Sequence, residues 1–305
     1  MKQRIKKFIL TLGIVSITGL LISLFTCKPI ARKSIAIITQ NTSPFCSEII
    51  TGITNCTTNT FSYSVFSAEN NPLLLTCYAE TVMNGSFDAV IAIAAQAAQV
   101  TRTVQQKRAL EIPLIFIGVR DPVNVGLVLS EEHPGVSCTG ITLNNLPLTK
   151  GAEVLLSAAP SISSVLIPYC PSSNAGATEK EAYAVKQFLN KKDISVTLLP
   201  VTTPHEAIEK THFSLLSHES ILILTDGVVT DAVEGIAKIA SSNAIPLVAF
   251  NLASINAGAT AAWGGNYESI GQQAHILLKK VLIENQKTSE TPVLRISGWD
   301  TIVIR

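Results

Sequence analysis

Short apolar runs alternate with longer helical stretches along the chain from residue 34 onward. The runs are continuously apolar, as in Ala89-Val90-Ile91-Ala92-Ile93-Ala94, and this pattern is typical of strands buried on both faces of a parallel sheet. Ser43-Pro44 and Asn71-Pro72 are helix-start signals, because a capping side chain precedes a proline that needs no amide partner. For the first half we expect strands at 34–39, 61–66, 87–94, 113–118 and 137–142, and helices at 44–57, 72–84 and 96–108.

The same alternation repeats after a polar segment at 144–147, which we interpret as a crossover. Here we expect strands at 163–167, 195–199, 220–224 and 246–250, and helices at 148–159, 178–190, 204–216 and 229–242. A last helix is expected at 267–284, followed by two short strands at 293–297 and 301–304. Two such series predict an α/β protein made of two doubly wound parallel-sheet lobes.

The composition agrees with a two-domain globular body. Of the 305 residues, 47% are apolar and 15% are charged, and the formal net charge is +1. The length allows two domains and the apolar fraction is enough for their cores, so extensive disorder is excluded. A nucleic-acid partner is not expected, because the balanced charge and the 6% aromatic content supply neither a basic stripe nor a stacking platform.

Residues 1–27 have the layout of an export signal. Four basic residues stand among the first seven, and an apolar run follows at 8–25. Leu24-Phe25-Thr26-Cys27 resembles a bacterial lipobox, in which the cysteine becomes the lipidated N-terminus. The alternative is an uncleaved transmembrane anchor, since about 18 residues is the minimum for a span. Both alternatives tether an exported body to a membrane, facing the periplasm or the cell exterior.

The five remaining cysteines form neither a disulfide framework nor a zinc pattern, because their number is odd and no CxxC spacing occurs. Cys46 and Cys56 are expected on one helix, where the helical rise holds them about 15 Å apart, too far for a disulfide. We therefore expect buried, unreactive thiols for most of these cysteines.

The polar groups that end the predicted strands are the candidates for ligand binding, because a doubly wound sheet binds ligands at the carboxyl ends of its strands. They are hydroxyls, amides and acids beside exposed helix amides, and such groups fit a small polar or zwitterionic ligand. The candidate ligand-binding residues are Gln40, Asn41, Ala95, Gln96, Asp121, Ser172, Ser173, Asn174, Asp226 and Asn251.

Known catalytic and cofactor motifs are absent from the sequence. There is no GxGxxG after a strand, no phosphate-cradling GxxxxGK[ST] and no GxSxG elbow. The five histidines form no HExxH and are expected mostly on helix surfaces. We therefore expect no catalytic residue, no cofactor and no metal site.

Four charged residues near the predicted strand ends have competing interpretations. Asp226 ends a buried strand at the expected cleft, and it either binds ligand or caps a loop. Asp231 falls in the first turn of the predicted helix 229–242, where a favourable interaction with the helix dipole explains it. Asp121 caps its turn, orders the hinge or contacts ligand. Arg120 is either a solvent-facing charge or a clamp for a carboxylate.

Two aromatic residues, Trp263 and Tyr267, lie near the expected return of the chain into the first lobe. An aromatic ring at such a place stacks on a ligand or packs the hinge. We favour packing for Trp263 and leave both interpretations open for Tyr267.

Several segments together carry a family resemblance. They are 92–99, 112–116, Asp121-Pro122-Val123, Gly126-Leu127-Val128, 136–142, 244–250 and the Gly265-Asn266-Tyr267-Glu268-Ser269-Ile270-Gly271-Gln272-Gln273-Ala274 stretch. The chain resembles the substrate-binding lipoproteins of ABC importers in the tryptophan/tyrosine-type group, over nearly all of residues 34–286.

This resemblance implies a type I periplasmic-binding-protein fold, in which two lobes joined by three crossings close around a ligand. Closure is expected about crossings near Asn144, Leu252 and Glu284. The implied organisation is a leader at 1–27, lobe 1 at 34–143 plus 253–286, and lobe 2 at 144–252 plus 287–305. Members of the group resemble receptors for amino acids, often aromatic ones, that deliver them to a permease with a separate ATPase.

The sequence departs from the family pattern where ligands are chosen. Ala95 and Gln96 stand where the family often has Thr-Pro, so a hydroxyl that binds carboxylates is missing. Arg120 replaces the family's Thr before Asp-Pro, and Gly227 follows Asp226 where the family tends to have Asn. These changes leave the identity of the ligand open, whereas the expected fold is unaffected.

The sequence thus predicts a membrane-tethered, monomeric solute-binding component of an ABC importer, with an amino acid or a similar small polar metabolite as ligand. The first alternative is a ligand-sensing ectodomain of the same fold without transport. The second is an exported α/β enzyme using Asp121 or Asp226, but no base, nucleophile or metal set accompanies either acid.

Overall fold

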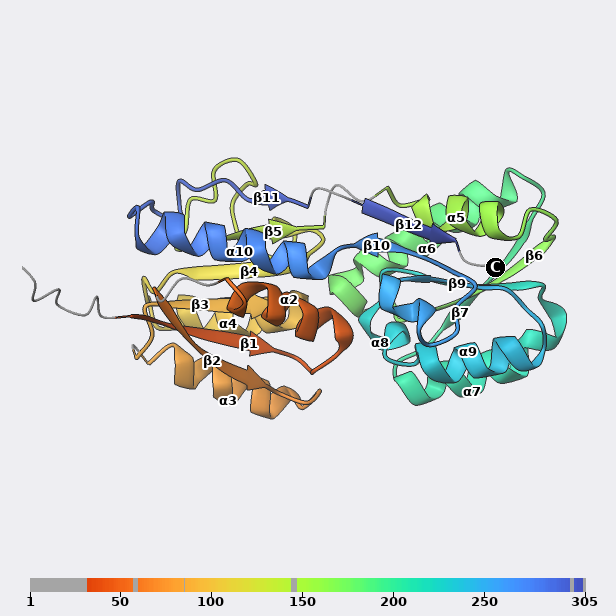
Figure 1. The fold of residues 1–305 in the computed structure, drawn as a ribbon, viewed down its shortest axis with the longest axis horizontal. Helices are drawn as coiled ribbons and strands as arrows, with labels where there is room; N and C mark the ends of the chain where they lie inside the picture. The colour runs from red at the N-terminus through yellow and green to blue at the C-terminus, as the bar shows by residue number, and fades with distance from the viewer. Residues whose placement is uncertain (1–31, 57–59, 85, 144–146, 297–298, 304–305) are drawn as a thin grey trace, which may run out of the picture.

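The structure is a computed structural model that describes residues 32–56, 60–84, 86–143, 147–296 and 299–303. Over these residues the chain folds into two α/β lobes, each built on one six-stranded sheet (Figure 1). The expected leader with Cys27 and the expected crossing at Asn144 lie outside the described residues. Among the described helices, none has both the length and the apolar character that a membrane span requires.

Lobe 1 contains a sheet with the strand order β11-β5-β4-β3-β1-β2, in which every pairing is parallel. Its strands are β1 (Lys33–Thr39), β2 (Phe61–Ser67), β3 (Ala89–Ile93), β4 (Leu114–Val119), β5 (Cys138–Thr142) and β11 (Leu294–Arg295). Its helices are α2 (Pro44–Thr54), α3 (Pro72–Val82), α4 (Ala95–Lys107) and α10 (Tyr267–Leu282).

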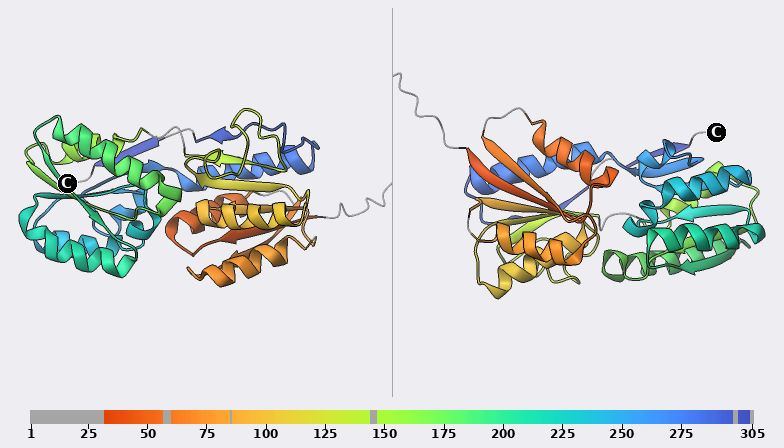
Figure 2. Two further views of the ribbon diagram at one scale, coloured as in Figure 1. Left: turned by 180° about the vertical axis from the view of Figure 1, so that it is seen from behind. Right: turned by 90° about the horizontal axis from the view of Figure 1, so that it is seen from below.

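Helices cover both faces of each sheet, as Figure 2 shows. In lobe 1, Ile35 and Ile37 of β1 pack in one apolar cluster with residues of α2 and α10. Ala36 and Ile38 pack in a second cluster with residues of α3 and α4. Because successive strand residues point to opposite faces, a sheet covered on both sides requires continuously apolar strands. This packing confirms the interpretation of the apolar runs.

Lobe 2 contains a sheet with the order β12-β10-β9-β8-β6-β7, which is parallel except for the antiparallel pairing of β12 with β10. Its strands are β6 (Ser164–Tyr169), β7 (Ser195–Pro200), β8 (Ser220–Ile223), β9 (Leu247–Phe250), β10 (Ala261–Gly265) and β12 (Trp299–Val303). Its α-helices are α5 (Lys150–Ala158), α6 (Ala177–Asn190), α7 (Pro204–Ser214), α8 (Gly227–Thr230) and α9 (Val233–Ser242). Three 3-10 turns complete it, η1 (Ser173–Gly176), η2 (Leu215–Ser217) and η3 (Leu252–Ile255).

The two helix starts marked by proline are confirmed, but only one of them has a side-chain cap. Asn71 Oδ1 accepts hydrogen bonds from the amides of Leu73 and Leu74 at 3.0 and 3.2 Å. Ser43 makes no capping bond, although Pro44 begins α2 as expected. The first turn of α2 therefore keeps amides without a side-chain partner.

The chain passes between the lobes three times, and two of the predicted boundaries differ from the structure. β10 pairs with β9 in lobe 2, so the return to lobe 1 falls between β10 and α10 and not at residue 253. β11 pairs with β5 in lobe 1, so the final passage follows β11 and not residue 287. Figure 1 shows β10 of lobe 2 leading directly into α10 of lobe 1.

The first difference arises because the sequence gives no signal for β10. Its residues are Ala-Ala-Trp-Gly-Gly, and alanine and glycine are depleted in strands. Pairing with β9 and β12 supplies the stability that local propensity lacks. The second difference arises because hydrogen bonds between distant residues hold the 287–293 segment on lobe 1, among them Thr139 Oγ1 to the Thr291 carbonyl at 2.8 Å.

The five described cysteines are all free thiols. Cys46, Cys138 and Cys170 are buried, whereas Cys77 is exposed. Cys56 lies beyond the end of α2, so the helix is shorter than expected and the two cysteines do not share it. Burial raises the pKa of Cys46 to about 11 and that of Cys138 to about 12, so both remain protonated at neutral pH.

Candidate functional site

A cavity of about 610 Å³ lies between the two lobes at the carboxyl ends of their strands. This volume is in the range of sites for small molecules. Nine of the ten candidate residues line the cavity, namely Gln40, Asn41, Ala95, Gln96, Ser172, Ser173, Asn174, Asp226 and Asn251. Lining residues that were not selected from the sequence include Ser43, Phe45, Gln99, Thr202, Asp231 and Phe250.

The wall in lobe 1 is formed by the segment after β1 and by the first turns of α2 and α4. α4 begins at Ala95 without a side-chain cap. Ala94 before it has a φ of +74°, a left-handed conformation that is costly for a residue other than glycine. The N-terminus of α4 therefore presents amides without a side-chain partner and a partial positive charge, both of which suit a carboxylate.

Asp226 organises the wall in lobe 2. Its Oδ1 accepts hydrogen bonds from the amides of Val228 at 2.9 Å and Val229 at 3.3 Å, and its Oδ2 accepts one from the amide of Cys170. The residue is 1% exposed. Burial raises its pKa, and the hydrogen bonds, above all that from the Cys170 amide, oppose this shift. The capping interpretation is thus confirmed, although Asp226 also lines the cavity.

Ser172, Ser173 and Asn174 lie between β6 and α6, where η1 forms. Asn174 Nδ2 donates to the carbonyl of Thr225 at 2.7 Å, so this turn is fixed to the end of β8. Asn251 has a φ of +88°, and its Oδ1 accepts a hydrogen bond from the Ala253 amide at 2.9 Å. These four side chains therefore line the cavity from a framework of lobe 2 that fixes their positions.

Asp231 connects the lobes across the cavity. Asn41 Nδ2 of lobe 1 donates to Asp231 Oδ2 at 2.9 Å. The interpretation of Asp231 in a helix first turn is wrong, because the predicted helix 229–242 is divided into α8 and α9 and Asp231 is the C-cap of α8. The division arises because Asp226 caps a separate short helix that ends at Thr230. Burial and the neighbouring Asp226 carboxylate raise the pKa of Asp231 to about 6.

Asp121 is the one candidate residue that does not line the cavity. Its Oδ1 accepts a hydrogen bond from the Asn124 amide at 3.1 Å, so it caps the turn after β4. Arg120 beside it is 5% exposed, which excludes a solvent-facing charge. Its guanidinium lies 3.7 Å from the Glu181 carboxylate of lobe 2, so it is not placed as a clamp for a carboxylate in the cavity either.

Aromatic rings line the cavity near the passage from β10 to α10. Phe45 and Tyr267 meet edge to face with ring centroids 5.0 Å apart, and both line the cavity, as does Phe250. The ring of Phe250 in turn packs against that of Trp263, with the ring centroids 4.9 Å apart. Trp263 is 1% exposed and lies behind this wall, in agreement with the packing expected for it. The rings supply apolar surface and stacking faces.

The charge of the cavity is acidic. Asp226 and Asp231 line it, and none of the described lining residues is a lysine, an arginine or a histidine. The described residues also contain no cluster of histidine, cysteine and acidic side chains able to hold a metal ion. A ligand with an ammonium group and an apolar part fits these surroundings.

Comparison with known proteins identifies the family. The profile described as "ABC transporter substrate binding protein" matches residues 36–304. The chain belongs to this family. Its members are solute-binding proteins and not enzymes, so membership confirms the predicted resemblance and excludes the enzyme alternative. The two sheets with helices on both faces confirm the predicted fold class.

Two of three similar proteins carry a ligand in their names. A "Tyrosine-binding protein" of Clostridioides difficile is 26% identical over 238 residues, which cover 78% of this chain and 66%, slightly under two thirds, of that protein. An ABC domain from Streptococcus pneumonia in complex with L-Trp superposes with a TM-score of 0.80 at 18% identity, covering 90% of this chain and 92% of that one. A ligand-free, open substrate-binding protein from Clostridium difficile has a TM-score of 0.65 at 25% identity, covering 89% and 92%.

Proposed function

We propose that this substrate-binding protein captures an amino acid, with preference for an aromatic one, in the interlobe cavity and delivers it to an ABC permease with a separate ATPase. The observation that carries the proposal is the combination in one cavity of acidic groups, helix amides without side-chain partners and aromatic rings. The names of the tyrosine-binding relative and the L-Trp complex support it.

Each part of such a ligand has a matching group in the cavity. The ligand ammonium is assigned to Asp231, because the two Asp226 oxygens already accept three backbone amides. The carboxylate is assigned to the N-terminal amides of α4 and to the hydroxyls of Ser172 and Ser173. The side chain is assigned to the aromatic wall that includes Phe45 and Tyr267.

The location and assembly of the protein complete the proposal. An importer's binding component works outside the cytoplasm, and the basic and apolar leader supports export. We propose lipidation at Cys27, with an uncleaved transmembrane anchor as the alternative, and a monomeric binding unit. A sensing ectodomain remains the rival role, and genes for a permease and an ATPase beside this one would favour transport.

Thermal unfolding with a matched ligand series tests the ligand class. L-tyrosine and L-tryptophan are expected to raise the melting temperature, because a ligand at a hundred times its Kd stabilises the folded state by about 2.7 kcal/mol. L-alanine lacks the ring, tyramine lacks the carboxylate and 3-(4-hydroxyphenyl)propionate lacks the ammonium, so each is expected to act more weakly. A shift with sugars or nucleosides and none with amino acids would refute the proposed ligand.

Affinity for L-tyrosine is expected to fall about tenfold between pH 7.5 and pH 5.0, because protonation of Asp231, whose pKa is raised from 3.8 to about 6, removes the partner of the ligand ammonium. In the protein without ligand, the same raised pKa gives the opposite dependence of stability on pH. The folded state holds the Asp231 proton more tightly than the unfolded chain does, so the stability that Asp231 contributes is lost as pH rises through about 6. Isothermal titration calorimetry at both pH values measures the first effect. Asp231→Asn should bind L-tyrosine weakly at both pH values. Asp121 lies outside the cavity, so Asp121→Asn should show the same fall in affinity with pH as the parent protein. An affinity that is equal at both pH values would contradict the assignment of Asp231.

A further inference from the structure

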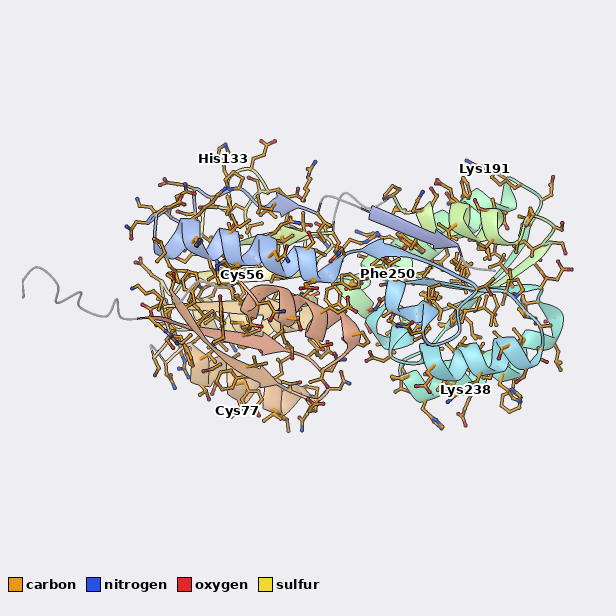
Figure 3. All side chains as sticks on the ribbon, in the orientation of Figure 1. Cys56, Cys77, His133, Lys191, Lys238 and Phe250 are labelled. Carbon is orange, nitrogen blue, oxygen red and sulfur yellow. The ribbon has the colours of Figure 1, made fainter. Side chains whose placement is uncertain are left out.

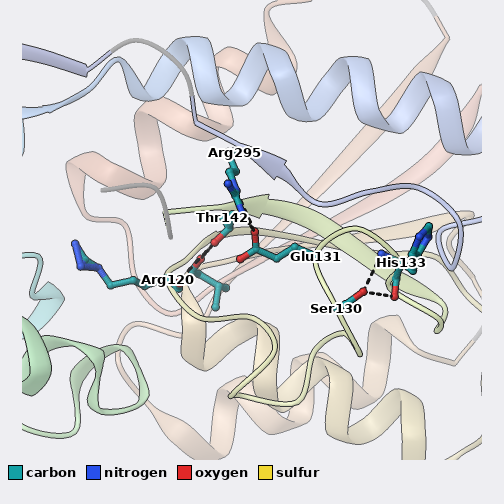
Figure 4. Close-up of polar contacts among 7 residues, drawn as sticks. Arg120, Ser130, Glu131, His133, Thr142 and Arg295 are labelled. Carbon is teal, nitrogen blue, oxygen red and sulfur yellow. Dashed lines mark hydrogen bonds and ion pairs between the residues drawn. The ribbon is translucent and has the colours of Figure 1, made fainter. Parts of the chain in front are cut away.

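Arg120 and Glu181 form a buried ion pair between the two lobes. Arg120 follows β4 in lobe 1, and Glu181 lies on α6 in lobe 2. Arg120 Nη2 is 3.7 Å from Glu181 Oε2, and the two side chains are 6% and 0% exposed. Figure 4 shows the Arg120 side chain pointing away from Thr142 of its own sheet and toward the green ribbon of lobe 2.

This pair differs from the other ion pairs of the described residues, each of which joins two groups of the same lobe. Glu131 with Arg295, also in Figure 4, is an example within lobe 1 at 3.0 Å. Separation of the lobes would return the charges of Arg120 and Glu181 to water. Closure therefore brings together two charges that the open arrangement would leave hydrated.

With the lobes arranged as they are in this structure, each of the two charges depends on the other. Arg120 Nε and Nη2 and Glu181 Oε2 are buried and have no hydrogen-bond partner. Burial raises the pKa of Glu181, and the Arg120 guanidinium opposes that shift. Removal of one partner leaves the other charge buried and uncompensated, which is far less favourable than either the intact pair or the loss of both.

The pair reaches the cavity through one residue. Thr225 Oγ1 donates to Glu181 Oε1 at 3.1 Å, and Thr225 lines the cavity. The Thr225 carbonyl accepts hydrogen bonds from Asn174 Nδ2 at 2.7 Å and Thr178 Oγ1 at 3.0 Å. Neither Arg120 nor Glu181 lines the cavity.

We propose that Arg120 and Glu181 are positioning residues that form an interlobe latch: the pair stabilises the closed arrangement and holds the cavity wall at Thr225, so it sets ligand affinity without touching ligand. The effect on affinity rests on the proposed solute capture. The effect on closure does not, because it concerns the protein without ligand. Hinge closure is a two-state change, and a bias toward the closed state raises apparent affinity.

The distance between two spin labels, one on each lobe, measures closure directly. Cys77 is an exposed thiol of lobe 1, and Lys238→Cys adds a second on lobe 2, where the Lys238 side chain is 73% exposed. Figure 3 shows both positions near the lower edge of the molecule, one on each lobe, so a change in the angle between the lobes is expected to change their separation. Cys27→Ser and Cys56→Ser would restrict labelling to the chosen pair.

Without ligand, Arg120→Gln and Glu181→Gln are each expected to shift the distance distribution toward longer distances. In L-tyrosine titrations both single variants should show an affinity lowered about tenfold, since the competent state is less populated. The double variant should lie closer to the parent than the sum of the single effects, because it leaves no unpaired charge. Arg120→Lys, which keeps the charge, should shift less than Arg120→Gln and provides a second variant if the latter folds poorly. Arg295→Gln, whose partner is in the same lobe, should leave the distances unchanged.

The inference is overturned if Arg120→Gln and Arg120→Lys both give the parent distance distribution. It is also overturned if only Glu181→Gln has an effect and the double variant equals it, since Glu181 would then act through Thr225 alone. If the distances shift as expected but neither L-tyrosine nor L-tryptophan binds the parent, the latch stands and the proposed ligand class fails.

Discussion

Asp226→Ala is expected to lower the free energy of unfolding by about 2–4 kcal/mol and to abolish measurable binding of an amino acid ligand. The carboxylate accepts backbone amides of Cys170, Val228 and Val229, and all three hydrogen bonds are lost in the variant. α8 then loses its N-cap, and the end of β6 is no longer hydrogen-bonded to the side chain of residue 226. Because residues of both segments line the cavity, its lobe 2 wall loses its geometry.

Urea unfolding and calorimetric titration with L-tyrosine measure the two effects of Asp226→Ala. Asp121→Ala is the matched control, because Asp121 also caps a turn but accepts one amide and lies outside the cavity. It is expected to cost about 1 kcal/mol of stability and to leave affinity unchanged. Parent-like binding by Asp226→Ala would show that the cavity wall does not depend on this carboxylate.

Gly271→Ala is expected to lower the free energy of unfolding by about 2–3 kcal/mol, because α10 and α2 pack backbone to backbone. A Cβ at residue 271 would lie 2.2 Å from the Ile49 carbonyl oxygen and 2.8 Å from Gly52 Cα. Neither atom belongs to a flexible side chain, so the two helices must separate. Phe45 and Tyr267 stand at the N-terminal ends of these helices and line the cavity, so affinity is expected to fall as well.

Gly227→Ala is the control for the unfolding experiment on Gly271→Ala. A Cβ at residue 227 would meet no atom within 4 Å, and Gly227 is the first residue of α8. Its replacement by alanine is expected to leave stability unchanged or to raise it by about 0.4–1 kcal/mol through the unfolded state. If Gly271→Ala unfolded at the same urea concentration as the parent, the close packing of α2 and α10 would not contribute to stability.

Nine of the ten residues that the sequence proposed line the cavity, because strand ends are a local feature. Once the apolar runs are assigned as parallel strands, the residues after them must gather at one edge of each sheet, as Gln40, Gln96 and Asn251 do. Asp121 also follows a strand but forms a turn cap instead. Position at a strand end therefore brings a residue near the cavity but does not by itself make it part of the lining.

The partners of the charged residues were beyond prediction from sequence. Arg120 and Glu181 are 61 positions apart, and Asn41 and Asp231 are 190 positions apart. No periodicity or motif relates residues at such separations, so the sequence favoured a solvent-facing charge for Arg120 over a carboxylate clamp, and the buried pair with Glu181 was not foreseen. One local signal was available for the position of Asp231. Aspartate is a preferred N-cap residue, so Asp226 could have been read as the start of a separate helix at Gly227.

The amino-acid sequence by itself determined the two α/β lobes, because continuously apolar strands require helices on both faces and only alternating strands and helices provide them. It also determined the strand ends from which the cavity is built. The tertiary structure alone decided that β10 joins lobe 2, that Asp231 meets Asn41 and that Arg120 pairs with Glu181. These outcomes depend on contacts between segments far apart in the chain, which the local preferences of an Ala-Ala-Trp-Gly-Gly segment or of a single charged side chain do not specify.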